Sequence, residues 1–203
     1  MGVAKTDVDR PAQDDGQTAV PRLALMDPAT IDDPELHAIF ERAKRLTTPR
    51  PEWFQVAAAN PALAKVWSAY WEATFREGQV EHRTKELMRL TIVALLDCAH
   101  CSTQRSVVAL EAGMSEELVA AAALPDADGL DYRQRVACRY GRALVLNDPT
   151  TEPQIFDSVY EELREAFSDA EIVELVCLAM MCIGGAWVAR GLNLPTGPLP
   201  VSA

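Results

Sequence analysis

The sequence predicts an all-α protein in which short helices follow one another along 203 residues. Apolar residues recur every three or four positions through most of the chain, which is the spacing of one face of a helix. Successive segments begin with Asp, Ser or Pro and end at Gly or Pro, the residues that usually bound helices. No segment alternates between apolar and polar residues over five positions, as a half-buried strand would. A helical bundle is therefore expected.

Nine helices are expected, each from its boundary residues and its apolar stripe. In chain order they cover residues 34–48, 51–60, 61–77, 84–96, 97–113, 115–124, 131–146, 152–167 and 168–191. Proline opens the first three, because its fixed φ angle suits the first helical turn. The leucines of the fourth lie on one stripe. Asp97 caps the fifth, which is expected to run without a break to Gly113.

The later helices carry the clearest capping signals. Ser115 precedes a short alanine-rich helix that Pro125 ends, and Asp131 precedes the next helix. The last helix begins with the capping box Ser168-x-x-Glu171, in which each side chain satisfies a backbone N–H group of the other residue.

One principal domain is expected over residues 31–194. A chain of this length buries roughly 70% of the surface of its unfolded form, which suffices for one core without disulfides or metals. Residues 1–30 are rich in Asp, Pro, Gln and Gly, so they are expected to be disordered or to form an arm over a neighbour. Residues 195–203 are expected to form a C-terminal tail.

A weak internal repeat leaves open whether the domain contains a duplicated helical unit. The segment Glu86-Leu87-x-x-Leu90 recurs 85 residues later as Glu171-Ile172-x-x-Leu175. Glu, Leu and Ile are common in helices, so the match does not decide the question.

Composition and charge exclude several classes of function. The chain has 19 Lys and Arg against 30 Asp and Glu and no local basic cluster, so no nucleic-acid binding is expected. The N-terminal segment lacks the apolar region of a signal peptide. The longest uncharged stretch, Leu175 to Ala189, is shorter than the ~20 residues that cross a bilayer, so no membrane association is expected. Five cysteines, an odd number without an export signal, favour a reducing compartment and a cytoplasmic protein.

The sharpest chemical feature is the segment Cys98-Ala99-His100-Cys101. With Asp97 as the N-cap, both cysteines lie near a helix start, where unpaired N–H groups and the helix dipole favour a thiolate. At about 100° per residue, Cys98, Cys101 and Arg105 share one sector, while His100 points away from Cys98. Both sulfurs and the Arg105 guanidinium are therefore expected in one pocket.

Glu86, twelve residues before Cys98, is the second candidate for chemistry. Its sector also holds Leu90 and Val93, so its carboxyl group projects from an apolar face that suits a general base. Alternatively, Glu86 pairs with Arg89 one helical turn later. The spacing leaves both interpretations open.

Together, these residues resemble the alkylhydroperoxidase D and carboxymuconolactone decarboxylase family. The resemblance rests on Glu86, eleven intervening residues, Cys98-x-His100-Cys101 and the later Gly113. It implies a helical bundle that assembles into a homotrimer or homohexamer and a peroxidase that cycles a disulfide. It further implies that Cys101 attacks the peroxide to form a sulfenic acid, that Cys98 resolves it as a disulfide, and that Glu86 and His100 assist by proton relay and hydrogen bonding. The implied partners are a peroxide or other small-molecule substrate and a thiol reductant.

Arg105 is a departure from this family pattern. The family signature ends Cys-x-x-x-His, and this chain has arginine where the histidine stands. An imidazole shuttles protons near neutral pH, whereas a guanidinium stays charged. We therefore expect Arg105 to stabilise the thiolate or to bind an anionic substrate.

The expected function is that of a thiol-dependent, peroxidase-like oxidoreductase using Cys98 and Cys101. Two alternatives remain: a non-redox enzyme of the same fold with Glu86 as base, and a helical oligomer that binds a small anion or senses redox state. No cofactor or metal is expected, because a zinc site needs three converging ligands and His100 faces away from the cysteines.

The remaining cysteines and aromatic residues are expected in the core. Cys138, Cys177 and Cys182 lie among apolar residues at helical spacing. The aromatic residues expected there are Trp53, Trp67, Tyr70, Trp71 and Phe75. The uncharged stretch of the helix over 172–191 exceeds what one neighbouring helix covers, so this helix is also expected to contact a second subunit.

Overall fold

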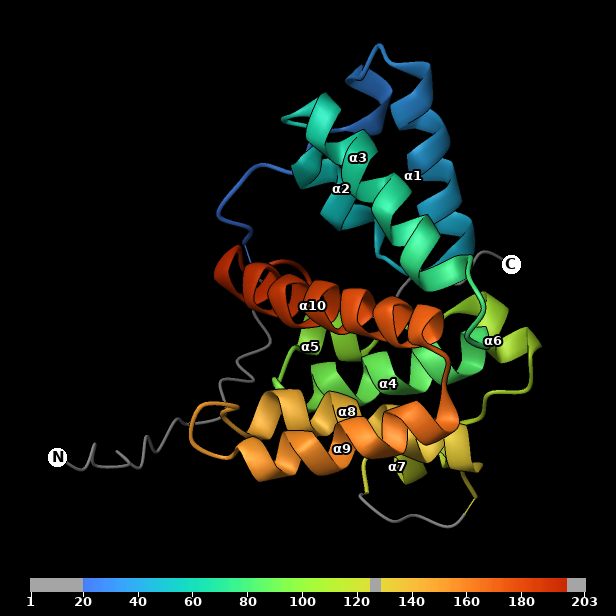
Figure 1. Cartoon of the computed structure of the whole chain (residues 1–203). Coiled ribbons are helices and arrows are strands. Elements are labelled where there is room, and N and C mark those ends of the chain that lie inside the picture. The colour runs from blue at the N-terminus through green and yellow to red at the C-terminus, as the bar shows by residue number, and fades with distance from the viewer. Residues whose placement is uncertain (1–19, 125–128, 197–203) are drawn as a thin grey trace, which may run out of the picture.

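The structure is a computed structural model that describes residues 20–124 and 129–196. Within these residues every regular element is helical, so the expected all-α class is confirmed (Figure 1). The elements in chain order are the 3-10 turn η1 (Pro28–Thr30), α1 (Pro34–Leu46), α2 (Pro51–Ala57), α3 (Pro61–Trp71), the π-helical turn η2 (Glu72–Arg76), α4 (His82–Leu95), α5 (Ala99–Ser102), α6 (Val107–Glu111), α7 (Glu116–Ala122), α8 (Tyr132–Leu146), α9 (Pro153–Ala166) and α10 (Asp169–Gly191).

The capping signals at the starts of α1, α8 and α10 form as expected. The Asp33 carboxylate accepts hydrogen bonds from two backbone N–H groups in the first turn of α1. Asp131 and Gln134 form a capping box at the start of α8, and Ser168 and Glu171 form one at the start of α10. These local interactions satisfy N–H groups that helix ends otherwise leave unpaired.

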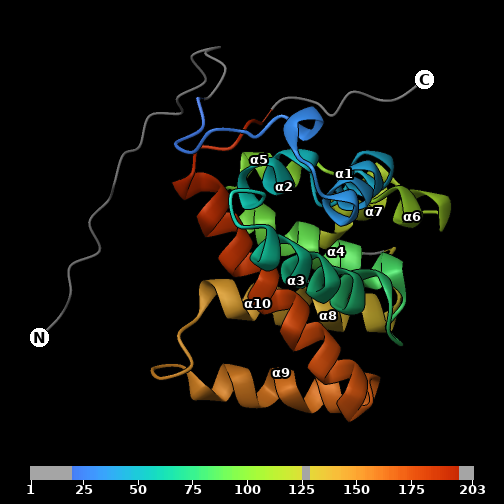
Figure 2. The same cartoon turned by 90° about the horizontal axis from the view of Figure 1, so that it is seen from above.

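α4 lies at the centre of the fold and packs against both α8 and α10 (Figures 1 and 2). Every residue from Thr84 to Val93 is buried, and three of them are charged. Buried charges need partners. Lys85 finds one on α10, where its Nζ atom lies 2.6 Å from Oε1 of Glu174, and Glu86 pairs with Arg89.

α8 approaches α4 closely because Gly141 has no side chain. A Cβ atom at Gly141 would lie 3.0 Å from the Ile92 side chain. α9 packs on α8, so these two helices form a layer beyond α4 (Figure 1).

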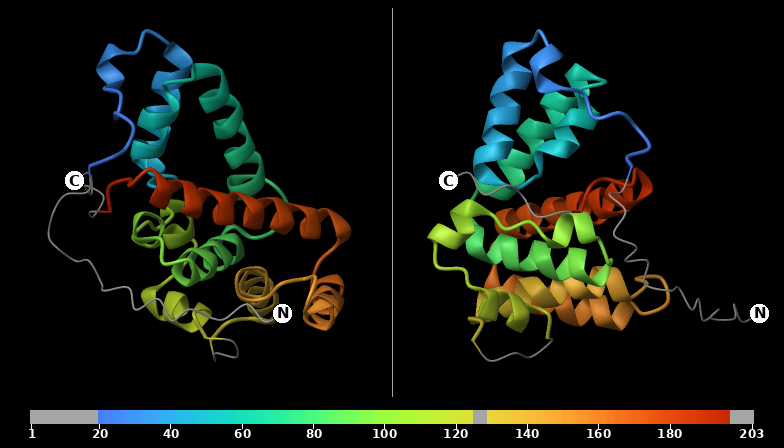
Figure 3. Two further views of the ribbon diagram at one scale, coloured as in Figure 1. Left: turned by 90° about the vertical axis from the view of Figure 1, so that its left-hand side faces the viewer. Right: turned by 180° about the vertical axis from the view of Figure 1, so that it is seen from behind.

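The first three helices form a group on the other side of α10 from α8 and α9 (Figure 3). They share a small core of their own, made of Leu36, Ile39, Phe40, Ala43, Phe54, Ala58 and Ala64. α2, α3, α5 and α10 all contribute residues to the cavity described below.

The expected single helix over 97–113 is wrong, because the chain breaks it into α5 and α6. Asp97 does not cap α5; it adopts a left-handed conformation with φ of 51°, and Cys98 is the N-cap residue. The chain leaves the helix after Ser102 and enters α6 after Ser106. In this gap, side chains of α4 form hydrogen bonds with the backbone: Arg89 donates to the carbonyl of Gln104, and Glu86 accepts the N–H of Ser106. These tertiary contacts outweigh the local preference for a continuous helix.

Part of the expected N-terminal arm lies against the domain. The backbone N–H of Arg22 donates to the carbonyl of Leu192 at 2.8 Å, and that of Met26 donates to the carbonyl of Gln55 at 3.2 Å. Residues 1–19 of the arm and 197–203 of the tail lie outside the described residues. The domain boundaries remain a prediction.

α10 is long and apolar enough, by length and composition, to pass as a membrane span, although helices of soluble cores pass the same test. One side of it is buried against α4, whereas Val173, Met180 and Trp187 on it are exposed.

The repeat of the sequence falls on α4 and α10. Glu86 is buried in the first copy, but Glu171 caps its helix in the second, so a duplication also remains a prediction.

Candidate active site

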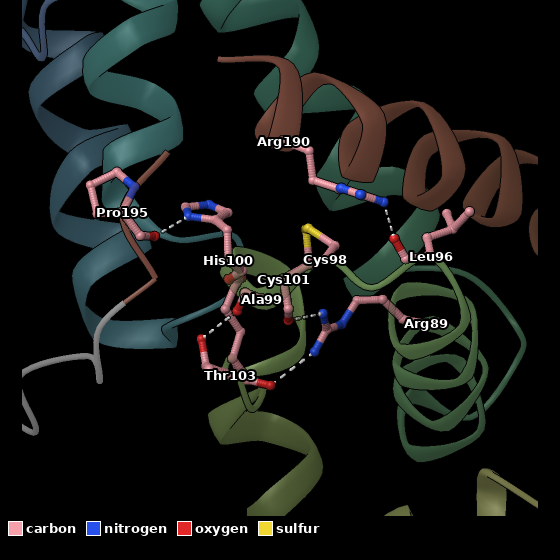
Figure 4. The surroundings of a disulfide bond; sticks show 10 residues. Arg89, Leu96, Cys98, Ala99, His100, Cys101, Thr103, Arg190 and Pro195 are labelled. Atoms are coloured by element: carbon pink, nitrogen blue, oxygen red, sulfur yellow. Dashed lines mark hydrogen bonds between the residues drawn. A yellow bond between two sulfur atoms is a disulfide. The ribbon is translucent and has the colours of Figure 1, made fainter. Parts of the chain in front are cut away.

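Cys98 and Cys101 are joined as a disulfide at the start of α5, with their Cα atoms 5.3 Å apart (Figure 4). The carbonyl of Cys98 accepts hydrogen bonds from the N–H groups of Cys101 at 2.9 Å and Ser102 at 2.8 Å, which closes the turn that holds the sulfurs together. Cys98 is completely buried, whereas Cys101 is partly exposed. Cys101 is therefore the accessible sulfur of the pair.

Cys101 lines a largely apolar cavity of about 490 Å³, open solvent at its mouth included. The cavity is walled by α2, α3, α4, α5, α10 and the segment after α10. Its lining residues are Pro49, Arg50, Trp53, Trp67, Trp71, Arg89, Val93, His100, Cys101, Gln104, Met181, Cys182, Gly185, Ala186, Ala189 and Leu194. The sulfur that can react thus faces a largely apolar cavity that is open to solvent at its mouth.

Glu86 and Arg89 form a buried ion pair beneath this cavity. Oε2 of Glu86 lies 2.6 Å from Nε of Arg89, and Oε1 lies 2.9 Å from Nη2. Of the two interpretations of Glu86, the structure supports the pair at one-turn spacing. Burial by itself lowers the pKa of Arg89, but the charge of Glu86 and its hydrogen bonds outweigh this effect, so that the pKa is raised.

The ion pair also fixes the backbone around Cys101. Nη1 of Arg89 donates to the carbonyl of Cys101 at 3.0 Å (Figure 4). Nη2 of Arg89 donates to the carbonyl of Gln104 at 3.1 Å. Oε1 of Glu86 accepts the N–H of Ser106 at 2.8 Å. These three bonds hold the gap between α5 and α6, so the pair positions the reactive turn. Arg89 is the site residue that the sequence interpretation missed, since it figured there only as a partner for Glu86.

His100 ties the dithiol turn to the segment after α10. Its Nδ1 atom lies 2.5 Å from the carbonyl oxygen of Pro195 (Figure 4). Burial lowers the pKa of His100, although the hydrogen bond to Pro195 opposes this shift. The ring is therefore neutral at pH 7 and donates from Nδ1. As expected, it points away from Cys98, toward Pro195 (Figure 4).

Arg105 lies outside the cavity, so the shared pocket expected for it is wrong. Its Nε and Nη2 atoms lie 2.8 and 3.0 Å from the two carboxylate oxygens of Glu116, and Nη1 donates to the carbonyl of Ser102 at 2.6 Å. The break after α5 turns the side chain out of the sector that a continuous helix would share with Cys101. The hydrogen bond from Arg105 lowers the pKa of Glu116.

Arg105→Met is expected to leave the reactivity of the reduced protein unchanged, because the guanidinium is bound to Glu116. The measurement is the rate at which iodoacetamide alkylates Cys101 at neutral pH. A several-fold slower alkylation in this variant would contradict the placement, since a cation that stabilises the thiolate typically changes its reactivity by that much or more.

Two histidines, His100 buried and His82 half-buried, are expected to make stability fall at acid pH. Burial lowers the pKa of His82 and of His100 below 6.5, so the unfolded chain binds more protons than the folded one as the pH falls through 6.5. The free energy of unfolding should therefore decrease from pH 7 toward pH 5, by at most about 1.4 kcal/mol per pH unit for each histidine. Urea unfolding of the wild type, His82→Gln and His100→Gln measures this slope. An equal slope in all three proteins would contradict the assignment.

The other cysteines lie in helices α8 and α10. Cys138 and Cys182 are buried, as expected of core residues, and burial raises the pKa of their thiols to about 11 and about 12. Cys182 nevertheless lines the same cavity as Cys101, which helical spacing did not indicate. Cys177 is half-buried. Among residues 20–124 and 129–196, no group of three or more His, Cys, Asp and Glu side chains could hold a metal ion.

Comparisons with known proteins find a family match over the part of the chain that holds this site. Residues 61–137 match the carboxymuconolactone decarboxylase family. Two uncharacterised proteins of Mycobacterium tuberculosis, Rv2313c of strain H37Rv and MT2376 of strain CDC 1551, are each 36% identical to the chain over 113 residues, or 55% of its length. The match covers 38% of each relative, so the chain spans well under half of their length.

Two solved structures share the fold. ATU0492 of Agrobacterium tumefaciens, a protein of unknown function suggested to be the antioxidant defence protein AhpD, superposes with a TM-score of 0.58 at 22% identity over 70% of this chain and 94% of its own. A variant of the debrominase Bmp8, bound to 2,3,4-tribromopyrrole, superposes with a TM-score of 0.72 at 14% identity over 91% of this chain and 96% of its own.

The family match runs from α3 to the middle of α8 and includes the whole dithiol segment. Helical architecture, the buried Glu86 and the Cys-x-x-Cys turn agree with it. Residues 61–137 are thus similar to the carboxymuconolactone decarboxylase family, and the fold is that of the AhpD-like structure.

Proposed function

We propose that this protein is a thiol-dependent oxidoreductase that reduces a peroxide by cycling Cys98 and Cys101 between dithiol and disulfide. The observation that carries the proposal is the pairing of a buried sulfur with one that lines an organic cavity. A nucleophilic thiolate needs access to its substrate, whereas a resolving thiol needs only access to its partner. Cys101 and Cys98 meet these two requirements.

The cycle has three steps. The Cys101 thiolate attacks one oxygen of a peroxide ROOH; the O–O bond breaks, an alcohol ROH leaves after protonation, and the sulfur becomes a sulfenic acid. The Cys98 thiol then attacks that sulfur, so that the S–S bond forms and water leaves. Two thiols of an external reductant finally reduce the disulfide and are themselves oxidised to a disulfide.

The neighbouring residues are proposed to position the turn. Glu86 balances the charge of Arg89. The role proposed for the pair is therefore to hold the backbone of Cys101, and not to transfer protons. His100 is engaged by Pro195 and keeps the segment after α10 against the cavity. A cytoplasmic location belongs to the same proposal, because the cycle needs a reducing thiol pool.

The test is a thiol count on fully reduced protein before and after one equivalent of peroxide. Of the five cysteines, two should lose their thiols and three should keep them. With excess dithiol reductant the peroxide should then be consumed over many turnovers. Loss of two thiols without turnover would favour the alternative of a redox sensor, and no loss would contradict both.

Self-assembly through the exposed side of α10 is part of the proposal. Val173, Met180 and Trp187 are 61%, 62% and 59% exposed and follow one another at intervals of seven residues, so they lie on one apolar side of α10. We expect light scattering at micromolar concentration to give a trimer or hexamer of the 22.2 kDa chain. Met180→Glu should lower this mass, whereas Leu146→Glu, at a 56% exposed position of α8, should not. A monomeric wild type would contradict the expectation.

A further inference from the structure

We infer that the dithiol cavity is one end of a longer binding site, whose other end is a groove along α2 and α3 that takes an unbranched aliphatic chain. Only the identity of the ligand end that reacts rests on the proposed function. The groove itself is defined by its own lining, and its ligand can be tested without any turnover.

The groove is large, open and almost entirely apolar. It encloses about 950 Å³, solvent included, and of the ten residues that line it only Asn60 is neither aliphatic nor aromatic. Leu63 and Val66, on α3, are 64% and 67% exposed. Residues 20–124 and 129–196 therefore leave this surface uncovered, although its burial would be favourable by about 25 cal/mol per Å².

The groove and the cavity are neighbours that share two wall residues. Trp53 and Trp67 line both of them, and their ring centroids lie 5.1 Å apart. Trp67 in turn stacks on Trp71, which lines only the cavity, with centroids 5.4 Å apart and planes 19° from parallel. Three packed indoles thus extend from the groove to the cavity that Cys101 lines.

The N–H groups of two of these indoles find no hydrogen-bond acceptor among the described residues, and a ligand could supply one. Among the described residues, the buried Nε1 atoms of Trp53 and Trp71 have no hydrogen-bond acceptor. Trp71 is only 6% exposed, and a buried donor without a partner is costly and uncommon. An oxygen at the head of a bound molecule would satisfy one of these donors, while the rest of the molecule runs into the groove.

The lining selects an aliphatic chain over other occupants. No charged side chain is among the described residues that line the groove, so a peptide or a charged ligand would lose hydration there without compensation. Ala57, Ala59 and Ala64 leave room for a chain without branches between the larger side chains. A methylene chain buries only apolar surface and needs no partner.

The experiment is a binding series on the oxidised protein, read by tryptophan fluorescence in a Trp187→Phe background. That change leaves Trp53, Trp67 and Trp71 as the only fluorescent indoles of the chain. The probes are ω-bromoalkanoic acids of 4 to 12 carbons, because bromine quenches a nearby indole. We expect each acid to quench the fluorescence, and its affinity for the protein to rise about fourfold with each added methylene until the groove is filled. An affinity that does not depend on chain length would overturn the inference.

Val66→Glu places a charge in the groove at an exposed position, and Leu146→Glu is the matched control on α8, with 56% exposure. Val66→Glu should weaken the 12-carbon acid at least tenfold and the 4-carbon acid by less than twofold, and Leu146→Glu should change neither. Equal effects of the two variants would overturn the inference. A second copy of the chain that covers the groove would also overturn it. In that case Val66→Glu would dissociate the oligomer that the wild-type chain forms, without weakening the binding of the 12-carbon acid. Because no peroxide is used, failure of this series and failure of the thiol count remain distinguishable.

Discussion

Cys101→Ser is expected to lower the rate of peroxide turnover by about a thousandfold or more, to the rate without protein. The serine hydroxyl is not ionised at neutral pH and cannot form a sulfenic acid. Turnover is measured as consumption of peroxide with excess dithiol reductant. The control is Cys177→Ser, which removes a half-buried cysteine outside the cavity and should keep full activity.

Cys98→Ser should behave differently from Cys101→Ser. Without the resolving thiol, Cys101 can still attack one peroxide, so one equivalent is consumed and the sulfenic acid remains. Trapping with dimedone should label Cys101 in this variant and nothing in Cys101→Ser. Labelling of Cys98 in Cys101→Ser would reverse the assigned roles.

Arg89→Met is expected to destabilise the protein by about 3 to 5 kcal/mol, because it leaves the carboxylate of Glu86 buried without a counter-charge. It also removes the donors to the carbonyls of Cys101 and Gln104. For a chain of this length, the melting temperature should fall by about 6 to 20 °C. Circular dichroism during heating measures it.

A matched control for Arg89→Met exists on α1. Glu41 and Lys44 form an ion pair with the same spacing of three residues, but it lies in solvent. Lys44→Met should therefore leave the melting temperature nearly unchanged. Similar losses in the two variants would show that the buried pair does not carry the stability assigned to it.

Local sequence signals predicted most of the helices because the relevant interactions are local. The N-cap at Asp131 and the capping box at Ser168 involve residues three positions apart, and they form as expected. The pairing of Cys98 with Cys101 is likewise a contact within one turn. Such features depend little on the rest of the fold.

The errors arose where distant segments decide the local conformation. The break after Ser102 depends on Arg89 and Glu86, which bind backbone groups up to 20 residues away. That break moves Arg105 to the surface. The contact of His100 with Pro195 spans 95 residues. No periodicity of the sequence encodes these contacts.

The tryptophans show a different limit. Their helical spacing indicated core residues, and Trp71 is indeed buried. Spacing alone cannot distinguish a core from the wall of a cavity, since both need apolar side chains on one face. Only the packing of α2 and α3 against α10 shows that three indoles surround the space that Cys101 lines.

The most direct test of the dithiol cycle is peptide mapping of reduced protein after one equivalent of peroxide. Trypsin should release residues 90–105 as one peptide that contains Cys98 and Cys101 and no other cysteine. If the cycle operates, this peptide loses two hydrogens as its disulfide forms and it resists alkylation, while Cys138, Cys177 and Cys182 are all alkylated. Alkylation of both cysteines in the peptide, or a bridge that includes Cys177 or Cys182, would contradict it.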